Sequence, residues 1–89
     1  MAILHQINHR EAFQRCQALV NKEDGIVLFE DAVLLLAENS KHFFNSDFQL
    51  YVLKADLDAR AIKAIPEVVA IDYDEWVELT LKFDKTISW

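Results

Sequence analysis

The sequence predicts one small α/β domain spanning residues 1–89, with a mostly parallel sheet of four to five strands and helices on both faces. Strand-like apolar runs alternate four times with helix-like segments, and crossovers of this length favour a parallel sheet. Residues 26–29 are four consecutive large apolar residues, which is typical of a strand covered on both faces. Eighty-nine residues, 53% of them hydrophobic, are enough for one core and too few for two.

The first half of the chain predicts two strands joined by an amphipathic helix. Residues 2–7 form a short run that reads as the first strand. Across residues 10–20 the apolar positions recur at helical spacing, while charged and amide side chains occupy the opposite face. Residues 25–31 then provide the central strand, and the carboxylate of Asp31 is placed to cap a second helix.

The body of that second helix, residues 32–37, is apolar on every side. Such a helix must be covered on more than the face that meets its own sheet, and another protein chain is one possible cover. The residues expected to contact that chain are Val33, Leu34, Leu35, Leu36 and the C-terminal Trp89. The alternative is that two of the three leucines pack inside the domain and the third is simply exposed.

The second half of the chain begins with a segment of turn-forming residues, 38–47, which predicts a loop. Residues 48–53 follow as the third strand. Asp56 is then placed to cap a short helix over residues 57–64, which must end before Pro66 because the residue preceding proline avoids helical geometry.

The last helix has the clearest end signals in the chain. It follows a fourth strand at residues 68–71, and Asp72 with Glu75 three positions later matches a capping box. Lys82 lies toward its negative end. The side chains expected to face the sheet are Trp76, Leu79, Thr80 and Phe83. Residues 86–89 alternate in polarity, which predicts an edge strand or a docking tail.

The charge balance disfavours several classes of function. Nine lysine and arginine residues stand against fifteen aspartate and glutamate residues, a net charge of −6, and no window clusters basic side chains. Direct binding of nucleic acid needs such clusters, so we expect none, and an anionic membrane surface is disfavoured too. The sequence shows no apolar run near the ~20 residues of a membrane span and no charged leader before an apolar segment, so we expect a cytoplasmic protein.

Cys16, the only cysteine, is the first candidate for chemistry, because a thiolate can act as a nucleophile or hold sulfur as a persulfide. It shares a helical face with Phe13 and Val20, the face assigned to the core. The helix dipole could lower the pKa of a thiol in the first helical turn, but Cys16 lies beyond that turn. A buried structural thiol is the favoured interpretation, and a sulfur acceptor is the alternative.

Other candidate sites are weaker. His5, His9 and His42 lack the spacing of a metal site, so no metal is expected. Glu30 and Asp31 follow a strand at its carboxyl end, where open sheets place their sites, but as neighbours they are more simply structural. Two carboxylates would repel phosphate, and no glycine-rich turn follows. A nucleotide- or anion-binding domain is therefore disfavoured, and no cofactor is expected.

Several segments, in their order and spacing, resemble the TusB/DsrH family. They are Ile3-Leu4-His5, Val27-Leu28-Phe29-Glu30-Asp31, Tyr51-Val52-Leu53, Asp56-Leu57-Asp58-Ala59-Arg60, Ile71-Asp72-Tyr73, Trp76-Val77, Leu79-Thr80 and Ser88-Trp89. No segment is diagnostic alone, but together they span nearly the whole chain. Ala32 and Ala61 depart from the pattern, because the family often has glycine at both positions, and this predicts a tighter turn or altered packing there.

The resemblance implies a DsrEFH-like fold and a non-catalytic subunit of a cytoplasmic sulfur-relay complex. It implies TusC/DsrF-like and TusD/DsrE-like partners in a dimer of heterotrimers, with the persulfide cysteine on the TusD-like subunit. TusB-type complexes pass sulfur through a TusE/DsrC-like carrier toward 2-thiolation of the tRNA wobble uridine. DsrH-type complexes serve sulfur oxidation, and DsrH proteins have a cysteine at the spacing of Cys16, so a DsrH-type subunit with Cys16 as sulfur acceptor stays open.

Overall fold

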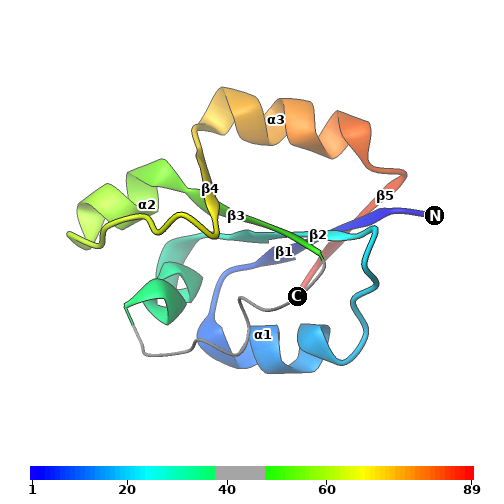
Figure 1. Cartoon of the computed structure of the whole chain (residues 1–89), viewed down its shortest axis with the longest axis horizontal. Coiled ribbons are helices and arrows are strands. Elements are labelled where there is room, and N and C mark those ends of the chain that lie inside the picture. Colours follow the sequence, from blue (N-terminus) through cyan, green and yellow to red (C-terminus); the bar gives the residue numbers. More distant parts are fainter. Residues whose placement is uncertain (38–47) are drawn as a thin grey trace.

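The computed structural model describes residues 1–37 and 48–89, and strands alternate with helices along them (Figure 1). In chain order the elements are β1 (Ile3–Ile7), α1 (Arg10–Gln17), β2 (Gly25–Leu28), the 3₁₀ helix η1 (Glu30–Leu36), β3 (Gln49–Leu53), α2 (Lys54–Ala59), β4 (Val69–Ile71), α3 (Tyr73–Lys82) and β5 (Lys85–Ser88). The loop predicted at residues 38–47, which includes His42, lies outside the described residues. None of the helices in the described part of the chain has the length and apolar character needed to cross a membrane.

The five strands form one parallel sheet in the order β4-β3-β2-β1-β5. The predicted central strand is confirmed, because β2 lies third of five and each of its residues is buried. Of the two alternatives predicted for the C-terminal residues, the edge strand is confirmed as β5. It pairs with β1, which places the C-terminus beside a strand from the start of the chain.

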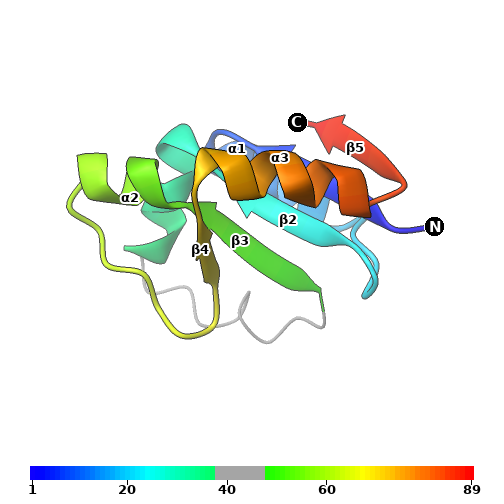
Figure 2. The same cartoon turned by 90° about the horizontal axis from the view of Figure 1, so that it is seen from above.

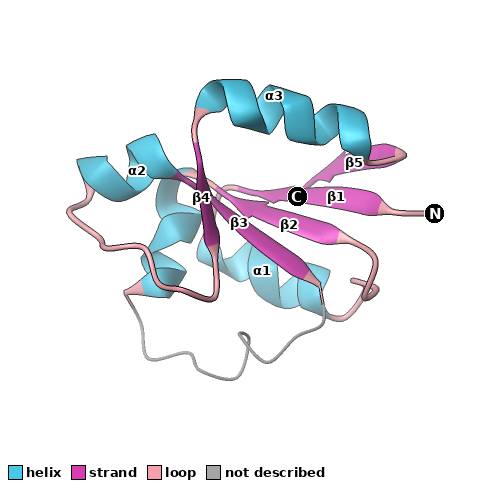
Figure 3. Cartoon of the chain, turned by 45° about the horizontal axis from the view of Figure 1, so that its top comes forward, coloured by secondary structure: helices cyan, strands magenta, loops and turns pink. Residues whose placement is uncertain are grey.

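The sheet is covered by α1 and η1 on one face and by α3 on the other (Figure 3). Side chains between the sheet and the first two helices form the larger core, which includes Phe13, Ile26 and Val33. A smaller core under α3 contains Leu4, Val27, Ile71 and Leu79. Seen from above, α3 lies over the middle of the sheet, with β3 and β4 on one side of it and β5 on the other (Figure 2). One helix therefore covers the second face incompletely.

The chain's only glycine leaves room for the close approach of a side chain. A Cβ atom added to Gly25 would lie 2.7 Å from Cζ of Phe83, the residue that ends α3. Real Cβ atoms do not approach other heavy atoms so closely. The start of the central strand is therefore glycine so that the end of the last helix can pack against it.

The last helix begins as predicted. The Asp72 carboxylate accepts a hydrogen bond from the Glu75 amide at 2.7 Å, and the Glu75 carboxylate accepts one from the Asp72 amide at 3.0 Å. This reciprocal pair is the capping box that the sequence predicted.

The second helix differs from its prediction. Residues 30–36 form 3₁₀ turns, and the N-cap position is Phe29 and not Asp31. The Glu30 backbone takes a left-handed φ of 49°, and its amide donates a 2.7 Å hydrogen bond to the carboxylate of Asp56. The cap is therefore supplied by a residue 26 positions away in the chain, which a local pattern cannot predict.

The predicted third helix is present, but it begins and ends earlier than predicted. It begins at Lys54, directly after β3, so Asp56 lies inside it and does not cap it. It ends before residue 64 because Ala61 adopts a left-handed φ of 54°. The Ile62 amide donates to the Leu57 carbonyl and the Ala61 amide to the Asp58 carbonyl, which is the Schellman pattern of helix ends.

Ala61 occupies the position of that motif where glycine is usual, so its left-handed backbone is strained by its own Cβ. We expect Ala61→Gly to raise the free energy of unfolding by about 0.5–1 kcal/mol, measured by urea denaturation. The matched control is Ala59→Gly, two residues earlier and within α2, which should lower it by about 0.5–1 kcal/mol. Destabilisation by both substitutions would contradict the strain at residue 61.

Candidate functional site

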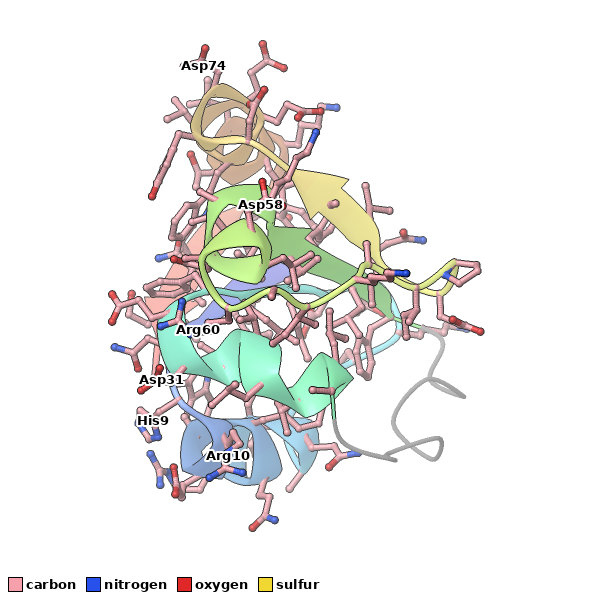
Figure 4. The ribbon with its side chains drawn as sticks, turned by 90° about the vertical axis from the view of Figure 1, so that its left-hand side faces the viewer. His9, Arg10, Asp31, Asp58, Arg60 and Asp74 are labelled. Atoms are coloured by element: carbon pink, nitrogen blue, oxygen red, sulfur yellow. The ribbon has the colours of Figure 1, made fainter. Side chains whose placement is uncertain are left out.

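The carboxyl edge of the sheet is the first candidate for a site, because open parallel sheets bind ligands at the carboxyl ends of their strands. Figure 4 looks onto this edge and shows His9, Asp31, Asp58, Arg60 and Asp74 on it. Arg60 pairs with Asp31 at 2.9 Å and donates to the backbone carbonyl of residue 56 at 3.3 Å. These contacts join η1 to α2, so the charges at the edge are used to hold two helices together.

The amide that would meet an anion at this edge is already occupied. It belongs to Glu30 at the start of η1, and the Asp56 carboxylate accepts its hydrogen bond. A phosphate would have to displace that carboxylate and approach Asp31 as well. His9 is used similarly, since its Nδ1 accepts the Ala12 amide at 3.3 Å and caps α1. Within residues 1–37 and 48–89, no three His, Cys, Asp or Glu side chains are grouped so as to hold a metal ion.

Cys16 lies where the sequence placed it, on the inner face of α1. Its exposure is 0%, and it belongs to the same buried cluster as Phe13 and Ile26. Burial raises the pKa of the thiol to about 12, and the nearby Asp24 carboxylate adds to the shift. A thiol without access or a stabilised thiolate is a poor nucleophile and a poor sulfur acceptor. The structure therefore supports the structural interpretation of Cys16.

A buried hydrogen-bond chain under the same face was missed by sequence reasoning. It runs from Trp89 through His5 to Asp24: the indole Nε1–H donates to Nδ1 of His5 at 3.1 Å, and Nε2 of His5 lies 3.0 Å from the Asp24 carboxylate. Because Nδ1 accepts from the indole, the proton of a neutral imidazole is on Nε2, which donates to Asp24. His5 is 2% exposed and Asp24 1% exposed.

The Asp24 carboxylate also accepts the backbone amides of Ile3 at 3.0 Å and Asn21 at 3.1 Å. It therefore joins the loop before β2 to the start of β1 and, through His5, to the C-terminus. Each of the three polar side chains in this series of hydrogen bonds has a partner. We assign this chain of bonds a structural role.

Of the five residues predicted to form an interface, three are buried inside the domain and two are only partly buried. Val33 is 0% exposed, and Leu35 and Leu36 are buried in the larger core. Leu34 is the half-buried member of the run, and Trp89 is partly buried against the same core. Only these last two keep surface that another chain could contact.

A family model described as "DsrH like protein" matches residues 7–86, which is most of the chain. The chain belongs to the DsrH-like family. The expected resemblance is thereby confirmed at the level of the family.

Relatives named TusB and one solved structure are similar to the chain over nearly its whole length. The chain is 28% identical over 95 residues to Protein TusB of Salmonella arizonae and, equally, of Salmonella newport, with 98% of this chain and 100% of each relative covered. The crystal structure of the ychN protein from E. coli superposes with a TM-score of 0.79 and 17% identity, covering 100% of this chain and 99% of that one. At that identity the likeness shows the fold alone, and it confirms the predicted α/β architecture.

Proposed function

We propose that this DsrH-like chain is a non-catalytic subunit of a cytoplasmic sulfur-relay complex of the TusBCD type. The observation that supports this most is the state of Cys16, the chain's one thiol, which is fully buried and has a raised pKa. A sulfur relay needs an accessible thiolate at each transfer step. In this proposal that thiolate belongs to a partner, and this chain supplies surface and organisation.

The relatives named TusB favour the TusB-type role over the DsrH-type role in sulfur oxidation. The partners in this proposal are TusC/DsrF-like and TusD/DsrE-like subunits, and sulfur leaves through a TusE/DsrC-like carrier toward 2-thiolation of the tRNA wobble uridine. The chain itself holds no tRNA in this scheme, because its charge of −6 would oppose the phosphate contacts that dominate nucleic-acid affinity. The alternative, Cys16 as acceptor in a DsrEFH-type complex, requires α1 to open.

Co-expression of this chain with two similar-sized α/β subunits from the same genome tests the assembly. We expect native mass spectrometry to show one complex that contains all three polypeptides, and sedimentation to show it intact at micromolar concentration. A chain that sediments as a monomer both alone and with the two candidate partners would overturn the proposed function.

A further inference from the structure

The outer side of α3 bears an apolar stripe. Tyr73, Val77 and Leu81 are 60%, 62% and 81% exposed, and their spacing of four residues places them on one face of the helix. Six large apolar side chains are strongly exposed in the described part of the chain, and four of them lie on α3 or on β4 beside it. Scattered exposed apolar residues are ordinary, but an aligned group on one helix marks an interaction surface.

A groove follows α3 on each side, because this one helix does not cover the whole face of the sheet. The groove toward β4 has a volume of about 360 Å³ and is lined by Tyr51, Val69 and Leu79, among others. The groove toward β1 has a volume of about 260 Å³ and is lined by Gln6, Trp76, Tyr73, Val77 and Thr80. The helix is thus a ridge between two hollows, a shape into which the side chains of another protein can interdigitate.

The rim of this surface is acidic. Residues 72–82 contain four acidic side chains and one basic side chain, and Asp74, Glu75 and Glu78 are exposed. A second copy of the chain would bring two acidic rims together, on a protein whose net charge is already −6. Like charges across an interface cost affinity, whereas lysine and arginine opposite these carboxylates would steer association.

We propose that the α3 face, defined as Tyr73, Val77, Leu81 and the two flanking grooves, docks another protein subunit whose apolar contact surface is bordered by lysine and arginine. This inference rests on the proposed function, since the partner is another subunit of the same complex. The sequence predicted an interface at η1, whereas this inference places the docking surface on the opposite side of the sheet.

Two variants of the co-expressed complex test the docking surface. Leu81→Asp should raise the dissociation constant by at least ~30-fold, because it puts a charge into the apolar centre. Glu78→Lys should raise it about tenfold, and added salt should weaken the wild-type complex. The matched controls lie in the other layer, at Glu11 on α1 and at the exposed Leu19 just after it: Leu19→Asp and Glu11→Lys should change the dissociation constant less than about twofold. Circular dichroism and thermal unfolding confirm that each variant is folded.

The outcomes separate this inference from the proposed function. If the wild-type chain joins no complex, both fail. If it joins one and the α3 variants bind as tightly as the wild type, only the docking surface is wrong. A larger effect of Leu19→Asp than of Leu81→Asp would place the docking surface at the end of α1, in the other layer. If the isolated chain forms a dimer that Leu81→Asp dissociates, the α3 face binds a second copy of this chain, and the proposal of a partner bordered by lysine and arginine is wrong. Affinity that does not change with salt or with Glu78→Lys would also contradict the charged rim.

Discussion

Replacing Asp24 with alanine is expected to lower the free energy of unfolding by about 3–5 kcal/mol. The carboxylate accepts hydrogen bonds from the amides of Ile3 and Asn21 and from Nε2 of His5. Asp24 is only 1% exposed, so water cannot readily replace these bonds. Its removal leaves three donors without partners, and each buried donor left unsatisfied costs about 1–3 kcal/mol. Urea or thermal denaturation measures the change.

Glu23→Ala is the matched control, because it removes a neighbouring carboxylate that is exposed, and it should change stability by less than about 0.5 kcal/mol. A loss below about 1 kcal/mol in Asp24→Ala would show that the buried chain of bonds adds little to stability.

The Asp24 carboxylate also makes the free energy of unfolding depend on pH in a defined direction. Burial alone would raise the pKa of Asp24, but hydrogen bonds from the Asn21 amide, the His5 ring and the Ile3 amide hold it below its ordinary value of 3.8. The unfolded chain therefore binds more protons near and below that value, so the stabilisation is present above it and is lost as the pH falls through the folded pKa. Asp24→Asn should show a shallower fall in unfolding free energy between about pH 5 and pH 3 than the wild type.

The thiol of Cys16 is expected to be labelled at least a thousandfold more slowly in the folded protein than in the unfolded chain. At neutral pH, a rise in thiol pKa from about 8.5 to about 12 lowers the thiolate fraction by roughly a thousandfold, and 0% exposure adds to this. The measurement is the rate of reaction with a thiol reagent, with and without denaturant. Since thiolate is the reactive species, a folded-state rate within about tenfold of the unfolded one would mean that α1 opens readily.

Local patterns in the sequence predicted most of the fold. The capping box at Asp72 and Glu75 depends on residues three apart, and the apolar run at β2 marks a strand buried on both faces, so both could be read directly. The start of η1 could not be predicted, because its amide is capped by Asp56 from a later element. The positive φ of Ala61 was signalled only by the family's frequent glycine at that position.

The sites were less predictable because they depend on tertiary contacts. His5, Asp24 and Trp89 are far apart in sequence and meet because β1 pairs with both β2 and β5. The prediction that another chain covers the all-apolar run at residues 32–37 gave too little weight to its alternative, because Leu35 and Leu36 pack inside the domain and Leu34 is half-buried. The sequence did indicate an exposed apolar side on α3, because Val77 and Leu81 lie on the side of the helix opposite Leu79. The prediction considered only the side that faces the sheet.

The proposed function makes the claim that this chain contributes surface to a sulfur relay while a partner subunit's thiol holds the sulfur. Intact-mass spectrometry of each polypeptide, after the reconstituted complex is loaded by a sulfur donor, shows directly where persulfide forms. We expect added sulfur on a partner and none on this chain, and an unchanged rate of transfer to the carrier in Cys16→Ala. Persulfide on Cys16, together with loss of transfer in Cys16→Ala, would contradict the claim and make this chain a sulfur acceptor.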